Sequence, residues 1–305
     1  MTTGAGAIRV GTASWTEKTL VESGAFYPAS VRSPEQRLRY YTTQFGVVEV
    51  DSTYYALPQA RNAAAWVERT PPDFRFGVKA FSAMTGHPVE PRRLDRDLVA
   101  ALPASMQHVR SIDAEDLPDA LRDEIWRRFR AGVEPLRAAR KLDYVLLQMP
   151  PWFAPSEASR RVLDEAVARL SGLRCAVEFR EAGWLAPEEA ERTLGWLAAR
   201  DLVYVCVDEP QGTRASVPPV AAATSHALAV VRFHGRRHDT WTRPGVPTTV
   251  RFRYRYARDE LAEWVPRLRA LAADGRPVLA LMNNCYRGHA VESARELQTL
   301  LAEGS

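Results

Sequence analysis

The chain has 305 residues, of which 46% are hydrophobic and 26% are charged, a balance typical of a globular protein with a sizeable core. Lys and Arg number 41 against 37 Asp and Glu, so the net charge is only +4, and the pI of about 9.1 suits either an anionic ligand or a simple bias toward arginine. No run of about 18 apolar residues could span a bilayer and no signal-peptide pattern opens the chain, so we expect a cytoplasmic protein without a membrane partner.

Eight short apolar segments, each followed by polar or turn-forming residues, predict β-strands. They are residues 8–13, 46–50, 74–79, 144–148, 175–179, 203–207, 229–233 and 278–282. The second is the most informative, because Glu49 lies within it and Asp51 to Tyr55 crowd its carboxyl end with polar groups. Carboxylates, hydroxyls and phenols at the end of a buried strand indicate that the strand opens into a site.

Helical patterns fill most of the intervals between these strands. We expect helices at residues 33–45, 59–69, 118–141, 156–170, 187–199, 258–273 and 290–301. The first has a good start signal in Ser33-Pro34-Glu35-Gln36, with a capping serine and a proline in the first turn. Residues 17–29 are expected to be a loop, and residues 251–256 an edge strand or an extended approach to the next helix.

The alternation of strands and helices without a break in composition predicts one (β/α)8 TIM-barrel-like domain over residues 8–305, after a disordered tail of residues 1–7. A long insertion, residues 81–143, follows the third strand, and we expect it to cover the mouth as a lid or substrate-binding segment. Neither GxGxxG after the first strand nor a P-loop is present, which excludes the commonest nucleotide fingerprints.

Several stretches taken together resemble the DUF72 family, also called YecE-like. They are Gly11-Thr-Ala-Ser-Trp15, Val48-Glu-Val-Asp-Ser-Thr-Tyr-Tyr55, Gln148-Met-Pro-Pro-Trp-Phe153, Ala176-Val-Glu-Phe-Arg180, Arg232-Phe-His-Gly-Arg236 and Asn283-Asn284. The resemblance runs from about residue 8 to residue 301 and implies a TIM-barrel-like fold, without bringing an established reaction. One departure is Ser14, which stands where the family opening resembles a second glycine.

Four carboxylates are the catalytic candidates: Glu49, Asp51, Glu178 and Asp208. In a barrel they lie at the ends of strands two, five and six, where they could act as acid and base, or hold a divalent metal together with His234. The alternative is ion pairing inside the barrel, of Glu178 with Arg180 or Arg232 and of Glu49 with Lys79. No cofactor is identified by the sequence.

The substrate-binding candidates also follow the predicted strands. They are Trp15, Tyr54, Lys79, Gln148, Arg180, Arg232, His234, Arg236, Asn283 and Asn284. Arginine offers a planar fork for phosphate or carboxylate, so Arg232, His234 and Arg236 are expected to form an anion clamp. Aromatic rings at a barrel mouth can stack on sugars or bases, or can simply pack under the loops.

These residues predict an enzyme, a hydrolase or an isomerase, that acts on a phosphate- or sugar-containing small molecule at the carboxyl end of the barrel. The alternative is a non-catalytic barrel that binds nucleotides or nucleic acid through its arginines and aromatic residues. Three cysteines, Cys175, Cys206 and Cys285, form no CxxC pair and are expected to be buried thiols rather than disulfides or zinc ligands.

Overall fold

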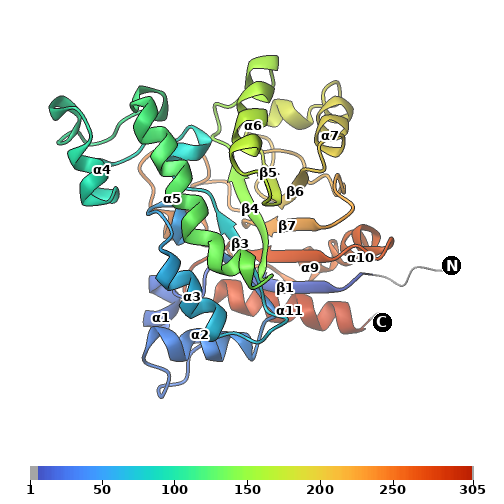
Figure 1. Cartoon of the computed structure of the whole chain (residues 1–305). Coiled ribbons are helices and arrows are strands. Elements are labelled where there is room, and N and C mark those ends of the chain that lie inside the picture. The colour runs from blue at the N-terminus through green and yellow to red at the C-terminus, as the bar shows by residue number, and fades with distance from the viewer. Residues whose placement is uncertain (1–5, 304–305) are drawn as a thin grey trace.

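The computed structural model describes residues 6–303 and contains a closed barrel of eight parallel strands in chain order, β1 to β8 (Figure 1). The strands are β1 (Ile8–Thr12), β2 (Val47–Val50), β3 (Arg75–Lys79), β4 (Leu142–Gln148), β5 (Cys175–Glu178), β6 (Val203–Asp208), β7 (Ala229–Phe233) and β8 (Val278–Met282). The barrel closes where β1 pairs with β8, with Ile8 opposite Val278 and Thr12 opposite Met282. The predicted TIM-barrel-like fold is therefore confirmed.

Helices surround the strands on the outside of the barrel (Figure 1). They are α1 (Lys18–Ser23), α2 (Pro34–Thr42), α3 (Ala60–Glu68), α4 (Arg96–Ala100), α5 (Asp119–Ala138), α6 (Glu157–Arg169), α7 (Ala190–Ala198), α8 (Thr248–Arg251), α9 (Arg258–Ala262), α10 (Val265–Ala272) and α11 (His289–Glu303). The predicted start of α2 is confirmed, because Ser33 and Gln36 form a capping box and Pro34 opens the helix.

Two local predictions were wrong. The expected loop at residues 17–29 contains α1, whose amino end is capped by the Glu17 side chain and whose carboxyl end is capped by Gly24 at φ 63°. The expected helix at residues 258–273 is two helices, α9 and α10, and Pro266 lies in the first turn of α10. Of the two alternatives for residues 251–256, the edge strand does not form: α8 ends at Arg251, and the chain leads on to α9 without regular structure.

The expected disordered tail covers two residues that the structure describes and five that lie outside the described residues. Gly6 donates its backbone N–H to Ala272 at 2.8 Å, and the carbonyl of Ala7 accepts from Val278 at 3.0 Å. Gly6 thus contacts the end of α10, and Ala7 contacts the start of β8.

The insertion after β3 divides into two parts. Its first part consists of short 3₁₀ helices and α4, joined by an antiparallel bridge between Val89 and Ile112, and α4 projects away from the barrel in Figure 1. Its second part is α5, which packs against α3 along the outside of the barrel. Gly132 of α5 makes this approach possible, because a Cβ there would lie 2.1 Å from the carbonyl oxygen of Pro58.

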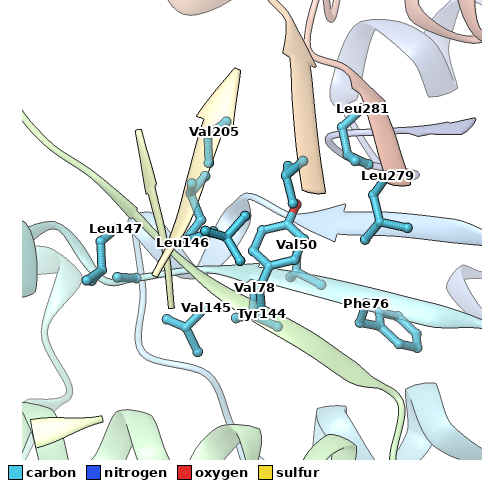
Figure 2. Close-up of a cluster of buried hydrophobic side chains, with 14 of the residues drawn as sticks. Val50, Phe76, Val78, Tyr144, Val145, Leu146, Leu147, Val205, Leu279 and Leu281 are labelled. Atoms are coloured by element: carbon cyan, nitrogen blue, oxygen red, sulfur yellow. The ribbon is translucent and has the colours of Figure 1, made fainter. Parts of the chain in front are cut away.

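Alternate residues of each strand point into the barrel and out toward the helices. Phe76 of β3 stacks on Trp66 of α3, with ring centroids 6.3 Å apart, and so faces outward, which turns Gly77 and Lys79 inward. Tyr144 of β4 lies over Gly77, since a Cβ at Gly77 would meet the Tyr144 ring at 2.3 Å. Figure 2 shows Tyr144 among the buried aliphatic side chains of the barrel. The space left by the glycine of β3 is thus filled by the tyrosine ring of β4.

Candidate functional site at the carboxyl end of the barrel

Three fully buried charged residues form the floor of the site. Arg232 of β7 is 1% exposed and lies between Glu49 of β2 and Glu178 of β5, both 0% exposed. Its Nη2 donates to Oε1 of Glu49 at 2.6 Å, and its Nη1 donates to Glu178. The phenol of Tyr144 donates to the second oxygen of Glu49 at 2.8 Å. With both of its carboxylate neighbours engaged, Arg232 braces the barrel from inside and is too deeply buried to meet a substrate.

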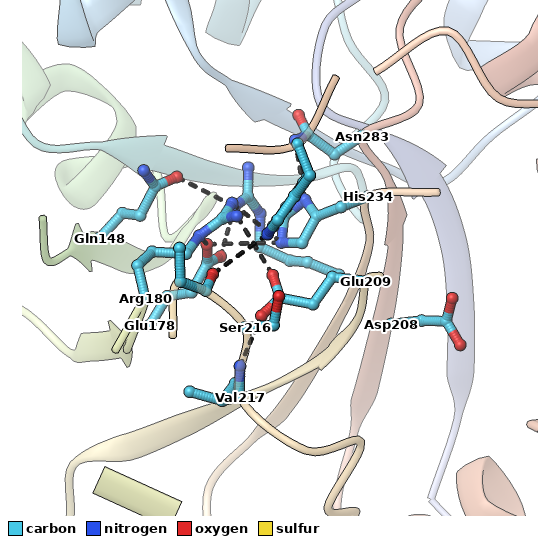
Figure 3. A network of polar contacts seen from close by, with 12 residues as sticks. Gln148, Glu178, Arg180, Asp208, Glu209, Ser216, Val217, His234 and Asn283 are labelled. Atoms are coloured by element: carbon cyan, nitrogen blue, oxygen red, sulfur yellow. Dashed lines mark hydrogen bonds and ion pairs between the residues drawn. The ribbon is translucent and has the colours of Figure 1, made fainter. Parts of the chain in front are cut away.

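A second layer lies above this floor, at the strand ends, and is drawn in Figure 3. The guanidinium of Arg180 donates to Oε1 of Glu178 at 2.5 Å and to Oε2 of Glu209 at 3.1 Å. Its third nitrogen lies 3.1 Å from Nε2 of His234. Glu209 also accepts from the backbone N–H of Val217 at 2.8 Å. Arg180 therefore connects β5, β6 and β7 through three separate side chains.

The imidazole of His234 is neutral in this setting. Burial lowers its pKa to about 3, and the neighbouring Arg180 adds to the effect. Both ring nitrogens have neighbours: Nε2 lies 3.1 Å from a guanidinium nitrogen of Arg180, and Nδ1 lies 2.9 Å from the amide nitrogen of Asn283. Nε2 also lies 3.4 Å from Oε1 of Glu178. His234 is thus positioned by a residue on each side of its ring.

The pKa values of the two buried glutamates of this layer are shifted in opposite directions. Burial alone would raise the pKa of Glu178, but Arg180 and Arg232 beside it hold that pKa well below its usual range. Burial raises the pKa of Glu209 to about 8 against the opposing effect of Arg180, with the charge of Glu178 adding to the rise. The layer thus places an ionised carboxylate next to one that holds a proton more readily.

Asp51 and Lys79 lie beside this network and take no part in it. Asp51 directly follows β2 and Lys79 is the last residue of β3, and both are partly exposed. Neither side chain forms an ion pair or a hydrogen bond with another of residues 6–303. Thr53 fixes their spacing, because its hydroxyl lies 2.9 Å from the carbonyl of Val50 and 2.6 Å from that of Lys79. The ammonium of Lys79 lies 4.3 Å from the centre of the Tyr54 ring.

The pKa values of these two groups are shifted toward each other. Burial raises the pKa of Asp51 to about 7, the charge of Lys79 opposes the rise, and that of Glu49 adds to it. Burial lowers the pKa of Lys79 to about 8, Arg232 adds to the fall, and Glu178 opposes it. Of the ion pairs named as the structural alternative, those of Glu178 with Arg180 and Arg232 form. The pair of Glu49 with Lys79 does not, because Arg232 and Tyr144 occupy the Glu49 carboxylate.

Asp208 and Arg236 lie elsewhere, which corrects two expectations from the sequence. Asp208 points away from the Arg180 network in Figure 3. Its carboxylate accepts from Tyr256 at 2.7 Å, from Trp264, which directly precedes α10, at 2.7 Å, and from Arg236 at 2.7 Å. Arg236 continues outward to Glu263 at 2.8 Å. The expected clamp of Arg232, His234 and Arg236 is therefore not one group of side chains.

The remaining candidates separate into two groups. Gln148 accepts from Arg232 at 3.4 Å and Asn283 contacts His234, so both belong to the site. Trp15 is buried with its ring 5.6 Å from that of Trp66, on the helix side of the wall. Asn284 donates to Ser293 of α11 at 3.1 Å and likewise faces the helices. Trp15 and Asn284 are thus outside the mouth.

Two residues of the site, Glu209 and Phe252, were not among the candidates from the sequence. Residues 203–207 are all apolar, so the alternation that turns Asp208 outward and Glu209 inward could not be read from them. Trp241 and Phe252, in the segment after β7, cover the network: Trp241 lies 5.1 Å from the Arg180 guanidinium, and the Phe252 ring lies 5.9 Å from that of His234. The expected cover, the insertion after β3, reaches the mouth through His87, whose ring lies 5.3 Å from that of Tyr54.

The described residues hold neither a membrane-spanning helix nor a ready metal site. Within residues 6–303, no helix is long and apolar enough to cross a bilayer. No three His, Cys, Asp or Glu side chains in the same span are placed to hold a metal ion together. Cys175 and Cys206 are buried and free, while Cys285 is partly exposed and also free.

The sequence profile of the family described as "Protein of unknown function DUF72" matches residues 9–305. The chain belongs to the DUF72 family. A curated relative, the UPF0759 protein YunF of Bacillus subtilis, is 31% identical over 280 residues, which cover 91% of this chain and 90% of YunF. The UPF0759 protein YecE of Escherichia coli is 28% identical over 207 residues, 67% of this chain and 61% of YecE.

Solved structures of DUF72 proteins share the fold of this chain. A DUF72 family protein of Thermotoga maritima matches with a TM-score of 0.74 and 26% identity, over 97% of this chain and 99% of its own. One from Enterococcus faecalis matches with a TM-score of 0.77 and 23% identity, over 97% and 96% of the two chains. The names of these DUF72 relatives state no reaction, so the activity has to be argued from the site itself.

Proposed function

We propose that this DUF72 protein is an enzyme that moves protons on a small sugar or sugar phosphate in the mouth of the barrel, and that it is an isomerase rather than a hydrolase. One observation carries the proposal: Asp51 and Lys79 are unpaired at adjacent strand ends, whereas Glu49, Glu178, Glu209, Arg180 and Arg232 are all held in ion pairs. Inward charges that only stabilise a barrel are expected to pair, as these five do.

The chemistry follows from the two protonation states. Between pH 7 and pH 8, Asp51 is mostly a carboxylate and Lys79 mostly an ammonium. A carboxylate can take the proton from a carbon next to a carbonyl, while an ammonium stabilises the negative charge that develops on the oxygen. Returning that proton to the former carbonyl carbon, while a proton passes from the neighbouring hydroxyl to the former carbonyl oxygen, converts an aldose into a ketose.

The surroundings suit a polyhydroxylated molecule. Tyr54 and the exposed Trp152 offer ring faces at the rim, and Gln148 and Asn283 offer neutral polar groups at neighbouring strand ends. Non-catalytic binding of nucleic acid has less support, because Arg180, Arg232 and Arg236 already engage carboxylates and leave no free row of guanidinium groups.

A deuterium-exchange screen over a range of sugars tests the proposal. The full chain is incubated in D₂O at pH 7.5 with a panel of aldoses, ketoses and their phosphates, and proton NMR follows the loss of carbon-bound hydrogen and the appearance of isomers. We expect exchange with at least one compound and its loss in Asp51→Asn. Release of inorganic phosphate or of a monosaccharide without deuterium exchange would indicate hydrolysis and contradict the isomerase assignment.

A further inference from the structure

Lysine is a rare residue in this chain, and its three occurrences have different surroundings. Only three of the 41 Lys and Arg residues are lysines, namely Lys18, Lys79 and Lys141. Lys18 is on the surface, 3.7 Å from Glu22. Lys141 is buried and donates to the carbonyls of Val67 and Thr70 and to the Thr70 hydroxyl, at 3.0, 2.8 and 2.8 Å. Its three protons are all used, as a structural ammonium requires.

Lys79 differs from both of these lysines. It is held inside the barrel mouth, yet none of its three protons has an acceptor among residues 6–303. A chain that uses arginine almost everywhere else has here a lysine, whose amine, unlike a guanidinium, can lose its proton and become a nucleophile. Asp51, an unpaired carboxyl group, follows the neighbouring strand β2 and interacts electrostatically with Lys79.

We propose that Lys79 is a nucleophile that forms a covalent imine with the carbonyl carbon of the substrate, with Asp51 as the proton donor to the carbonyl oxygen. This deepens the proposed function and rests on it for the location of the site. The proposal narrows the substrate class to an aldehyde or ketone in its open-chain form. It also gives Lys79 a covalent role in addition to the electrostatic role described under the proposed function.

The step balances without an added oxidant or reductant. The lone pair of the neutral Nζ attacks the carbonyl carbon, the π electrons move to oxygen, and that oxygen takes a proton from Asp51 to give a carbinolamine. Nζ then returns a proton to the Asp51 carboxylate, and Asp51 passes this proton to the hydroxyl, which leaves as water. The product is an iminium that withdraws electrons from the neighbouring carbon, whose proton the Asp51 carboxylate can then remove.

The neighbours of Lys79 favour the amine form. Burial lowers the pKa of Lys79 to about 8, and Arg232 and Arg180 add to the fall, while Glu178 and Glu49 oppose it. Lys79 is still mostly an ammonium near neutral pH, but a larger minority of it is the free amine than for an ordinary lysine. The Tyr54 ring on one side limits where Nζ can lie, and Thr53 holds the backbone of Lys79 against that of Val50.

Reductive trapping tests the imine directly. The full chain is incubated at pH 7.5 with D-glyceraldehyde, dihydroxyacetone or pyruvate in the presence of sodium cyanoborohydride, which reduces an iminium to a stable secondary amine. Peptide mass spectrometry then compares labelling of Lys79 with that of Lys18 in the same sample. We expect at least one of the three probes to label Lys79 ten times faster than Lys18, and Asp51→Asn to slow this labelling.

Two results would overturn the proposal. One is labelling of Lys79 by all three probes at or below the rate of Lys18. The other is a Lys79→Arg variant that keeps the deuterium exchange of the parent, because a guanidinium can supply charge but cannot form the imine; the proposed isomerase would then stand without it. Trapping at Lys79 in a protein that exchanges no deuterium would support the imine and contradict the isomerase. Thermal unfolding of Lys79→Arg and Lys79→Met checks that both variants are folded.

Discussion

Asp208 and Glu209 are neighbours in sequence, but their carboxylates lie on opposite faces of the barrel wall. Asp208 faces outward to Tyr256 and Trp264, and Glu209 reaches inward to Arg180. The period of two along β6 requires this separation. One residue therefore fastens the helices to the barrel, and the other belongs to the candidate site.

Replacing Asp208 with Ala should destabilise the protein by about 3 kcal/mol, because it leaves the buried Tyr256 and Trp264 donors and one side of Arg236 without an acceptor. Urea unfolding measures the change. Glu209→Gln is the matched variant and should cost less than about 1 kcal/mol, since the amide oxygen still accepts from Val217 or Arg180. Equal losses in the two variants would contradict this division of roles.

The order and number of strands could be predicted from the sequence, because apolar runs and their breakers are local signals. The inward or outward direction of a given residue could not, since a parallel strand buried on both faces is apolar on both. For this reason the sequence pointed to Asp208, and not to Glu209, as a catalytic candidate. That the inward carboxylates would pair with basic side chains could be predicted from the sequence. Which carboxylate pairs with which cation could not, because it depends on the stagger of the strands around the whole barrel.

The cover of the site shows the same limit. Residues 236–256 carry Trp241 and Phe252 over Arg180 and His234, but this placement depends on contacts such as that of Trp241 Nε1 with the carbonyl of Ala215 at 3.2 Å, 26 residues away. Length alone pointed to the insertion after β3, which mainly packs α5 outside the barrel against α3. A long loop can cover a site, but its contacts determine which part of the molecule it covers.

Opening this cover should make His234 reactive. Trp241→Ala removes the ring that lies over Arg180 and 6.1 Å from the imidazole, so we expect modification of His234 by diethyl pyrocarbonate to rise at least five-fold. Peptide mass spectrometry follows the reaction. Trp196→Ala is the control, because Trp196 lies 4.4 Å from the Arg200 guanidinium on the outer surface at α7. A similar rise in both variants would indicate general loosening and not a local cover.

Gly77 should tolerate no side chain while Tyr144 keeps its ring. In Gly77→Ala the new Cβ would meet the Tyr144 ring at 2.3 Å and push its hydroxyl from Glu49, and we expect a loss of about 2 kcal/mol. Urea unfolding measures this loss. Adding Tyr144→Leu should recover part of it, because the smaller side chain makes room for the methyl group. Strictly additive losses in the double variant would show that the two positions do not meet.

The titration of Asp51 gives a prediction in which stability and activity change in opposite directions. The pKa of Asp51 is about 7 in the folded chain, against about 3.9 for an unfolded aspartate, so the native state binds more protons between these values and loses stability as pH rises through them. Asp51→Asn should therefore match the parent near pH 4 and exceed it at pH 8, by about 1 kcal/mol after allowance for the partial exposure of the carboxylate.

Urea unfolding at pH 4 and pH 8 measures this difference, and the deuterium-exchange screen measures its functional counterpart. Asp239→Asn is the control, because Arg237 beside Asp239 lowers the pKa of that exposed carboxyl, which gives the opposite sign. A gain in stability at pH 8 together with loss of exchange would mark Asp51 as a residue kept at the expense of stability for its chemistry. A loss of stability at pH 8 would mean instead that Asp51 forms a stabilising pair with Lys79 and is already satisfied.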